Sequence, residues 1–328
     1  MLFRSTHSVY AANDGLHSPP VRVFVARQVA LRFSAADPTR KRLYLLTRDS
    51  NPGGQRNSLV TLGMEHGDVI NQIPGFMAAP VAMAISSDGR YLYFADRVDD
   101  SVAQATMRRY DTVTAAFDLA WTVPIGWVDN SPAITITPVP DAPDTIVTWN
   151  PSSGVAIFDG DRIRPNGSVR AGFKATDEPA FVTQSRIYLN GPSNACWQWM
   201  DFDADGITGG SPGCSAEEPP GVARDGGLVY LLDGERTFAV SLPDLLLPRS
   251  PPPLKKRIYD LARRRAYLAN TWPFTNSVQL YEFDLKTQQP SAEIPLTASV
   301  LERSSFGLYP GVTGGVLVVT ASSITLLH

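Results

Sequence analysis

The stretch PVAMAISSDGRYLYFADRVDDSVAQATMRRYD, residues 80–111, decides the fold. Short runs that contain apolar, aromatic and β-branched residues cover Val81–Ile85, Arg90–Ala95 and Thr106–Tyr110, and Ser87-Asp88-Gly89 supplies turn residues between the first two runs. Short apolar runs interrupted by turn residues at hairpin spacing predict three antiparallel strands. We interpret the stretch as one unit of a repeat.

The same turn-and-strand unit recurs along the chain. Seven segments align, and each carries an apolar anchor or a tyrosine within its second strand. The anchors are Tyr44, Tyr93, Ile146, Tyr188, Tyr230, Tyr267 and Val318. Their spacing of roughly 40 to 50 residues is the period of four-stranded propeller blades. The sequence therefore predicts an all-β fold, a seven-bladed β-propeller of four-stranded antiparallel blades, over residues 21–328.

The two ends of the chain complete this prediction. The seventh unit supplies three strands before His328, so we expect the N-terminal strand Val21–Val25 to complete the last blade. Such a strand closes the ring and hides the sheet edges that an open array exposes. Residues 1–20 fall outside the repeat, and we interpret them as a leader or linker remnant placed to cap the last blade.

Composition argues against several classes of partner. The net charge is −3 with Lys and Arg spread along the chain, which is not the electrostatic pattern of a nucleic-acid-binding protein. No apolar run approaches the roughly 18 residues of a membrane helix, so no membrane span is expected. The first residues lack the apolar centre of a secretory signal, which fits an intracellular protein or a trimmed chain.

Two segments carry a resemblance to a known family. ISSDGRYLYFADR (residues 85–97) and FSAADPTRKRLYLLTRD (residues 33–49) resemble the blades of YVTN-type propellers of bacterial and archaeal surface proteins, a fold shared with lactonase-like seven-bladed propellers. The resemblance spans residues 21–328, and its motifs specify blades and not chemistry. It implies an extracellular or cell-envelope location and a role in binding or scaffolding.

The two cysteines suggest a disulfide. If Ala204-Asp205-Gly206 is a three-residue hairpin loop with Gly206 in the left-handed conformation, Cys196 lies directly opposite Cys214. Opposed positions on antiparallel strands are close enough for a bridge, which would stabilise the fold by about 3 kcal/mol. The alternative is a pair of buried free thiols. A disulfide agrees with an oxidising, extracytoplasmic compartment.

The same loop contains a possible calcium site. Asp201, Asp203 and Asp205 followed by Gly206 match the spacing in which carboxylates converge on a hard cation. Position 212, where a bidentate Glu is usual, is Pro, and Asp and Gly are also favoured in hairpin turns. We therefore favour a solvated turn and expect no cofactor, with a calcium ion held by the three aspartates as the alternative.

Loops at one end of the predicted blades carry the candidate binding residues. Large aromatic residues beside amides and charges suit protein or glycan recognition. The candidates are Trp149, Asn150, Asn270, Trp272, Asp96 and Arg97. The alternative is that Trp149 and Trp272 pack between blades. The favoured function is a non-catalytic recognition or scaffold module for a protein or glycan partner, alone or within a larger surface assembly.

Catalysis has little support in the sequence. The four histidines, His7, His17, His66 and His328, are not repeated and stand beside no candidate nucleophile, which disfavours a Ser-His-Asp arrangement. The alternative function is a lactonase-like hydrolase with a divalent metal in the central channel, held by Asp49, Asp96 or Asp233. A separate motif, Asn166-Gly167-Ser168, matches a glycosylation sequon, but Asn-Gly is a strong hairpin signal and we interpret it as a turn.

Overall fold

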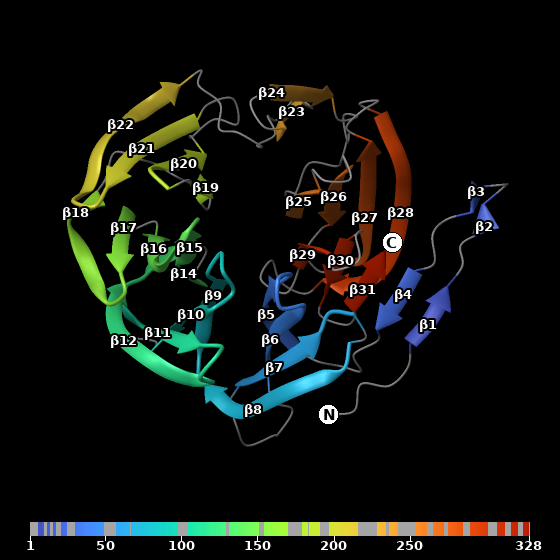
Figure 1. The fold of residues 1–328 in the computed structure, drawn as a ribbon, viewed down its shortest axis with the longest axis horizontal. Coiled ribbons are helices and arrows are strands. Elements are labelled where there is room, and N and C mark those ends of the chain that lie inside the picture. The colour runs from blue at the N-terminus through green and yellow to red at the C-terminus, as the bar shows by residue number, and fades with distance from the viewer. Residues whose placement is uncertain are drawn as a thin grey trace. The chain divides into compact units, whose positions relative to one another are not determined.

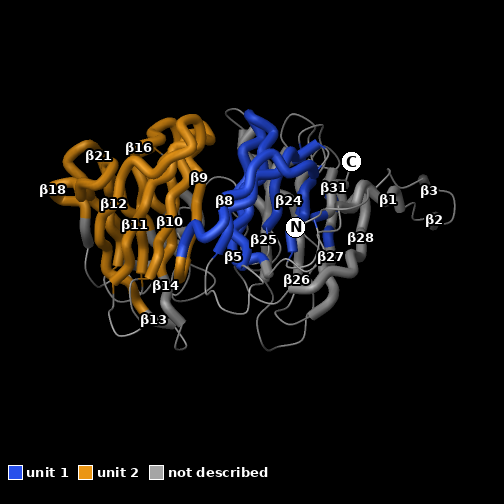
Figure 2. Tube along the Cα trace, turned by 90° about the horizontal axis from the view of Figure 1, so that it is seen from below, with its two compact units in different colours: residues 1–77, 240–328 blue, residues 78–239 orange. Residues whose placement is uncertain are grey.

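The structure is a computed structural model of the 328-residue chain. It describes residues 6–9, 12–13, 16–17, 21–24, 30–48, 57–65, 67–97, 104–128, 131–150, 154–169, 179–182, 184–190, 197–215, 228–233, 236–241, 254–260, 265–271, 275–284, 289–300, 307–311, 316–320 and 324–327. All regular elements in these residues are strands. The chain divides into two compact units, residues 1–77 with 240–328 and residues 78–239 (Figure 2).

The deciding stretch forms the first sheet of the second unit. Its strands are β9 (Pro80–Ile85), β10 (Tyr91–Arg97), β11 (Gln104–Asp111) and β12 (Ala116–Pro124), in the order β12-β11-β10-β9 (Figure 1). The predicted turn lies between β9 and β10, where Gly89 has φ of 72° and donates its N–H to the carbonyl of Ser86 at 2.9 Å. All three predicted strands are confirmed, and a fourth follows them.

Two further sheets of the second unit are joined at their outer strands. The joined order is β15-β16-β17-β18-β22-β21-β20-β19, and β18 and β22 are linked by one parallel pair, Asn166 with Gly206. The strands are β15 (Thr135–Val139), β16 (Ala142–Asn150), β17 (Gly154–Asp159), β18 (Arg162–Val169), β19 (Pro179–Val182), β20 (Arg186–Asn190), β21 (Trp197–Asp203) and β22 (Gly206–Ser215). A two-stranded sheet, β13 (Gly126–Val128) with β14 (Ser131–Ala133), precedes them.

The first unit repeats the four-stranded meander twice. Its strands are β5 (Ala30–Asp37), β6 (Arg42–Arg48), β7 (Asn57–Gly63) and β8 (Val69–Met77), then β25 (Leu254–Asp260), β26 (Arg265–Thr271), β27 (Thr275–Asp284) and β28 (Gln289–Val300). A short two-stranded sheet of β23 (Leu228–Asp233) and β24 (Arg236–Ser241), most of which belongs to the second unit, comes before β25 in the chain.

The last sheet of the first unit combines the two ends of the chain. Its order is β1-β4-β31-β30-β29, built from β1 (Thr6–Val9), β4 (Val21–Phe24), β29 (Gly307–Pro310), β30 (Val316–Val319) and β31 (Ile324–Leu327). Strand β4 pairs with β31, so the predicted N-terminal strand lies in the same sheet as the last strands. Strand β1 adds a fifth strand on β4, and β2 (Ala12–Asn13) pairs with β3 (Leu16–His17). Closure of a ring and the number of blades stay predictions.

The cores lie between the faces of successive sheets. In the second unit one cluster joins Tyr93 and Met107 of the β9–β12 sheet to Ile146 and Phe158 of the β15–β18 sheet. A second cluster joins the other face of β15–β18, including Val147, to strands β20 and β21. Both faces of β10 and of β16 are therefore buried, which explains the continuous rather than alternating apolar sequence of these two second strands.

A β-bulge recurs near the start of the outer strand in five sheets. In each case the register between the third and fourth strands shifts just before a large apolar residue at the end of the third strand. These residues are Leu62, Tyr110, Phe158, Phe202 and Phe283. The repeat thus includes, at the same place in each of these outer strands, a residue whose side chain is turned from its regular direction.

Two predictions about hairpins are corrected by this register. The β21–β22 turn has two residues, because Asp203 pairs with Gly206, and not the three that we predicted. Shifts on both sides of Trp199 then bring Trp197 opposite Ser215, whereas opposed cysteines require Trp197 opposite position 213. Bulges cannot be counted from the sequence, and they remove the basis of the predicted disulfide; Cys196 lies outside the described residues.

The Asn-Gly motif is also placed differently from the prediction. Asn166 and Gly167 lie inside β18, in an irregular segment between the pairs Phe158–Ile163 and Ala156–Ser168. The hairpin turn of this sheet is instead at residues 160–161, where Gly160 has φ of 62°. The Asn-Gly pair is used for the contact with the next sheet rather than for chain reversal.

Candidate functional site

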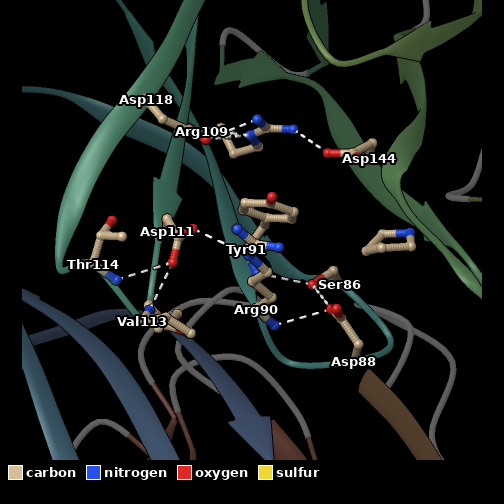
Figure 3. A network of polar contacts seen from close by, with 12 residues as sticks. Ser86, Asp88, Arg90, Tyr91, Arg109, Asp111, Val113, Thr114, Asp118 and Asp144 are labelled. Atoms are coloured by element: carbon tan, nitrogen blue, oxygen red, sulfur yellow. Dashed lines mark hydrogen bonds and ion pairs between the residues drawn. The ribbon is translucent and has the colours of Figure 1, made fainter.

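We call the ends of the second-unit sheets that carry the first-to-second and third-to-fourth turns the turn edge. Its centre is Arg109 of β11, whose guanidinium reaches two carboxylates (Figure 3). Nε and NH2 donate to Asp118 of β12 at 3.0 and 2.7 Å, and NH1 donates to Asp144 of β16. Asp118 and Asp144 belong to neighbouring sheets, so the guanidinium ties the two sheets together.

The bulge in β12 makes this contact possible. Arg109 pairs with Leu119 and Tyr110 with Phe117, which leaves Asp118 as the extra residue. A bulged residue is turned away from its regular direction, and here the carboxylate is turned toward Arg109. The side chain of Arg109 is only 10% exposed, whereas those of Asp118 and Asp144 are 33% and 62% exposed.

Aromatic rings complete the surroundings of Arg109. The ring of Tyr91 lies between two guanidinium groups, with the carbon of Arg109 at 4.1 Å and that of Arg90 at 4.9 Å from its centroid (Figure 3). Cations over an aromatic face are attracted by the ring quadrupole. Tyr93 is fully buried and donates its hydroxyl to the carbonyl of Pro143 at 2.6 Å, a second link between the same two sheets.

The charges of this cluster are fixed at neutral pH. Burial lowers the pKa of Arg109, but hydrogen bonds to Asp118 and Tyr93 outweigh it, and the pKa is raised overall. Burial raises the pKa of Tyr93. The guanidinium therefore stays charged and the phenol stays neutral, so these two groups act in binding and packing and not as acids or bases.

Asp111 stabilises the neighbouring turn. Its Oδ1 accepts the backbone N–H groups of Val113 at 2.7 Å and Thr114 at 3.1 Å, and its Oδ2 accepts Nε–H of Arg90 at 3.1 Å. Burial alone would raise the pKa of Asp111, but these hydrogen bonds lower it overall. The backbone N–H groups in a four-residue turn have no neighbouring strand to donate to, and the carboxylate accepts these hydrogen bonds instead.

At the turn edge, polar contacts also join the two halves of the eight-stranded sheet, β15–β18 and β19–β22. Arg164 of β18 binds Asp159 at 2.8 Å, lies over the ring of Phe202 at 5.7 Å and donates to the carbonyl of Asp203. The backbone N–H of Asn166 donates to the carbonyl of Asp205 at 2.8 Å. These contacts hold the β18 irregular segment against the β21–β22 turn.

The opposite ends of the sheets, which we call the loop edge, hold four of the predicted binding residues. Trp149 is 5% exposed and packs in the core between β15–β18 and β20–β21. Asn150 is buried and donates its side-chain amide to the carbonyl of Pro124 at 3.1 Å, and buried Asp96 accepts the N–H of Ala79 at 2.7 Å. Arg97 is half-buried at the end of β10.

For Trp149 the packing alternative is therefore observed, and its use as an exposed binding residue is corrected. An indole beside an amide has the same composition whether it faces solvent or a neighbouring sheet. Asn270 is the sixth residue of β26, where it pairs with Lys255 and Gln279, and its side chain lies outside the described residues. Trp272 also lies outside the described residues.

The predicted calcium residues are used differently. Asp201 pairs with Arg186, at 2.6 and 3.1 Å, and that guanidinium lies 4.2 Å from the ring centroid of Trp199. Asp203 accepts the backbone N–H of Asp205 at 2.8 Å, as an ordinary turn does. Within the described residues no group of three metal-binding side chains is gathered. Of the proposed channel aspartates, Asp49 lies outside the described residues.

The sequence analysis missed the turn edge, although a signal is present. Four third strands end in an aromatic residue followed by Asp: Tyr110-Asp111, Phe158-Asp159, Phe202-Asp203 and Phe283-Asp284. The aromatic residue precedes the bulge; the carboxylates of Asp111 and Asp203 cap their turns, whereas that of Asp159 accepts hydrogen bonds from Arg164 and Thr145. Aligning third strands as well as second strands would have found this motif.

Comparison with known proteins gives the fold. No known protein family and no curated protein matches the chain. A structure of U3-55K matches with a TM-score of 0.56 at 10% identity, covering 94% of this chain and 98% of that chain. A crystal structure of RRP9 WD40 repeats matches with a TM-score of 0.55 at 13% identity, with the same coverage. At this identity the likeness shows the fold alone, a β-propeller.

These comparisons correct the predicted location. An extracellular or cell-envelope address rested on a resemblance to surface-protein propellers, but the matched structures are U3-55K and the WD40 repeats of RRP9. The fold signature is shared by both groups, so blade motifs carry no information on compartment. The described part of the chain contains no helix with the length and hydropathy needed to cross a membrane.

Proposed function

We propose that the chain is a non-catalytic protein-interaction scaffold built as a closed seven-bladed propeller. The fold likeness to WD40 repeats over 94% of the chain supports the architecture. We also propose that the chain is related to the YVTN-type propellers, but not that it shares their surface location. The partner is a protein.

One observation carries the proposal. Among the side chains that the structure describes, the large apolar residues that are exposed lie at one place in the repeat, in the turn before an outer strand or at the strand's beginning. They are Val69 (41% exposed), Ile70 (49%), Val113 (67%), Phe117 (39%) and Ile163 (49%). Exposed apolar side chains that recur at an equivalent position favour contact with a partner, because their burial there is favourable.

The polar residues nearby are engaged within the protein. Arg109 is bound to two aspartates, Asp111 to two backbone N–H groups, and Arg164 to Asp159. Groups with these partners are fixed in place and shape the surface around the exposed apolar residues. Within the second unit, Val113, Phe117 and Ile163 are therefore exposed beside polar groups that are already fixed, as a rigid recognition surface requires.

Site-specific photo-cross-linking tests the function. A benzophenone amino acid replaces Phe117 or Ile163, and the full chain is irradiated in extract of its source cells; the matched control carries the same group at Gln104, an exposed residue at the loop edge. We expect cross-links to one protein that unlabelled chain competes away. Absence of a competable product at both sites contradicts the scaffold function, as does chelator-sensitive hydrolysis of lactones by the purified chain.

A further inference from the structure

The outer strands differ in how their free edges are protected. Five four-stranded sheets or sheet halves end in a long outer strand, and four of these strands contain proline before their last residue. The prolines are Pro74 in β8, Pro165 in β18, Pro212 in β22, and Pro290 with Pro295 in β28. Proline has no N–H to offer, and natural sheets place it on edges where pairing with another chain must be avoided.

Strand β12 lacks this protection. Its only proline, Pro124, is the last residue, and the run Leu119-Ala120-Trp121-Thr122-Val123 carries no charge. The run begins after the bulge at Asp118 and pairs regularly with β11 up to Pro124. On its other side β12 has no partner strand in the part of the chain that the structure describes. One row of main-chain groups of a regular, uncharged strand is thus open to pairing.

The chain itself shows that outer edges of this fold accept a further strand. Strand β1 adds to β4 in antiparallel register through four residue pairs, from Thr6–Phe24 to Val9–Val21 (Figure 1). Strand β22 lies against β18 through the pair Asn166–Gly206. Addition of an extended segment to a sheet edge gives affinity through main-chain hydrogen bonds, and side-chain contacts give specificity.

We propose that the outer edge of β12 is a docking strand for an extended segment of a partner protein, which has a basic residue next to a large apolar one. This inference rests on the proposed scaffold function and names the surface used. The partner segment pairs with Leu119–Val123 and becomes the fifth strand of the β9–β12 sheet.

The chemistry of the two faces selects this partner. On one face Arg109 is shared by the exposed carboxylates of Asp118 and Asp144, which leaves one negative charge in excess. On the other face Phe117 is partly exposed and packs edge-on against Tyr110 at 5.5 Å. Successive residues of an added strand point to opposite faces, so a basic residue and its apolar neighbour meet these two sites.

Comparison of β12 with β8 suggests two variants that block the outer edge of β12. Ile73 of β8 pairs with Leu59, and Trp121 of β12 pairs with Met107, at equal distances from the bulge. Counted from the bulge, Thr122 is therefore the counterpart of Pro74, although Pro74 lies at a second register shift in β8 and Thr122 pairs regularly with Thr106. Thr122→Pro removes one N–H group of the strand, and Ala120→Lys adds a charge at an exposed position of the edge.

The test uses a phage-displayed library of random dodecapeptides on the full chain. We expect selected peptides with Lys or Arg adjacent to a large apolar residue, and binding weakened about tenfold or more by Thr122→Pro and by Ala120→Lys. Gln72→Lys, the matched change in β8, leaves binding unchanged. Pro74→Thr creates a second, weaker site. Thermal melting verifies that each variant folds.

Two results overturn the proposal. One is a selection that enriches no such peptide; the other is equal binding of the peptides to the parent chain and to a folded Thr122→Pro variant. If either occurs while competable cross-links at Phe117 or Ile163 persist, the scaffold function stands and only the docking strand is wrong. Loss of both the cross-links and the peptides removes the function as well.

Discussion

The loop edge and the turn edge of residues 78–239 use similar residues for different purposes. At the loop edge, Trp149, Asn150 and Asp96 are buried and bind backbone groups or pack in a core. At the turn edge, Asp144 and Phe117 keep part of their surface in solvent although they contact Arg109 and Tyr110. The contrast shows that residue type alone does not indicate a binding surface; what matters is whether a neighbouring sheet covers it.

Truncation of Trp149 is expected to give the largest effect. Trp149→Ala leaves a cavity between two sheets and lowers the free energy of unfolding by about 3–5 kcal/mol. Phe117→Ala at the turn edge, where the ring is partly exposed, costs about 1 kcal/mol or less. Urea denaturation measures both. Similar small losses for the two variants would mean that the loop edge is not packed as described.

Gly206→Ala tests the junction between the joined sheets. Gly206 has φ of +112°, and an added Cβ would lie 2.4 Å from the carbonyl carbon of Asn166. We expect a loss of about 2 kcal/mol or more, from backbone strain and from separation of β18 and β22. The matched control is Gly209→Ala in the same strand, where an added Cβ meets nothing within 4 Å. Equal stability of the two variants contradicts the junction.

Replacement of Arg109 tests the centre of the turn edge. Arg109→Leu removes the contacts to Asp118, Asp144 and Tyr91, and the exposed carboxylates regain water, so the expected loss is about 1–2 kcal/mol. Arg90→Leu removes an ion pair whose guanidinium is half exposed, so we expect a smaller loss than for Arg109→Leu. Thermal unfolding compares the two variants. A larger loss for Arg90→Leu would reverse the assigned order of importance.

The smallest effect expected is a pH dependence from Asp159. Hydrogen bonds from Arg164, then one from Thr145, lower the pKa of Asp159 below its ordinary value of 3.8, against a smaller opposing effect of burial. The stabilisation is therefore present above that value and is lost as the pH falls through the lower, folded-state pKa. Because the side chain is about half exposed, the contribution is about a few tenths of a kcal/mol. Asp159→Asn should flatten the decline of the melting temperature below pH 4, and an unchanged decline would contradict the assignment.

The strands could be predicted because each inner or second strand has its own pattern of apolar residues and turns. Ser86 to Gly89 form the turn that the sequence indicates. Register could not be predicted, since one bulge between Asp201 and Phe202 and another between Trp197 and Trp199 shift every later pair. The disulfide prediction depended on that register.

The site could be predicted only in part for a related reason. Trp149 and Asn150 lie where a neighbouring sheet covers them, and coverage depends on how successive sheets stack. Asp118 reaches Arg109 only because a bulge turns it. The prolines of the outer strands, in contrast, can be identified from the sequence once the strands are known, and they single out β12.

Residue-resolved hydrogen exchange of the native chain tests the account most directly. The account predicts that within Leu119–Val123 alternate amides exchange rapidly, because their N–H groups face the open edge, while the amides bonded to β11 and the indole N–H of Trp149 exchange slowly. Uniform protection along Leu119–Val123, or rapid exchange of the Trp149 indole, would contradict an open outer edge and a packed loop edge.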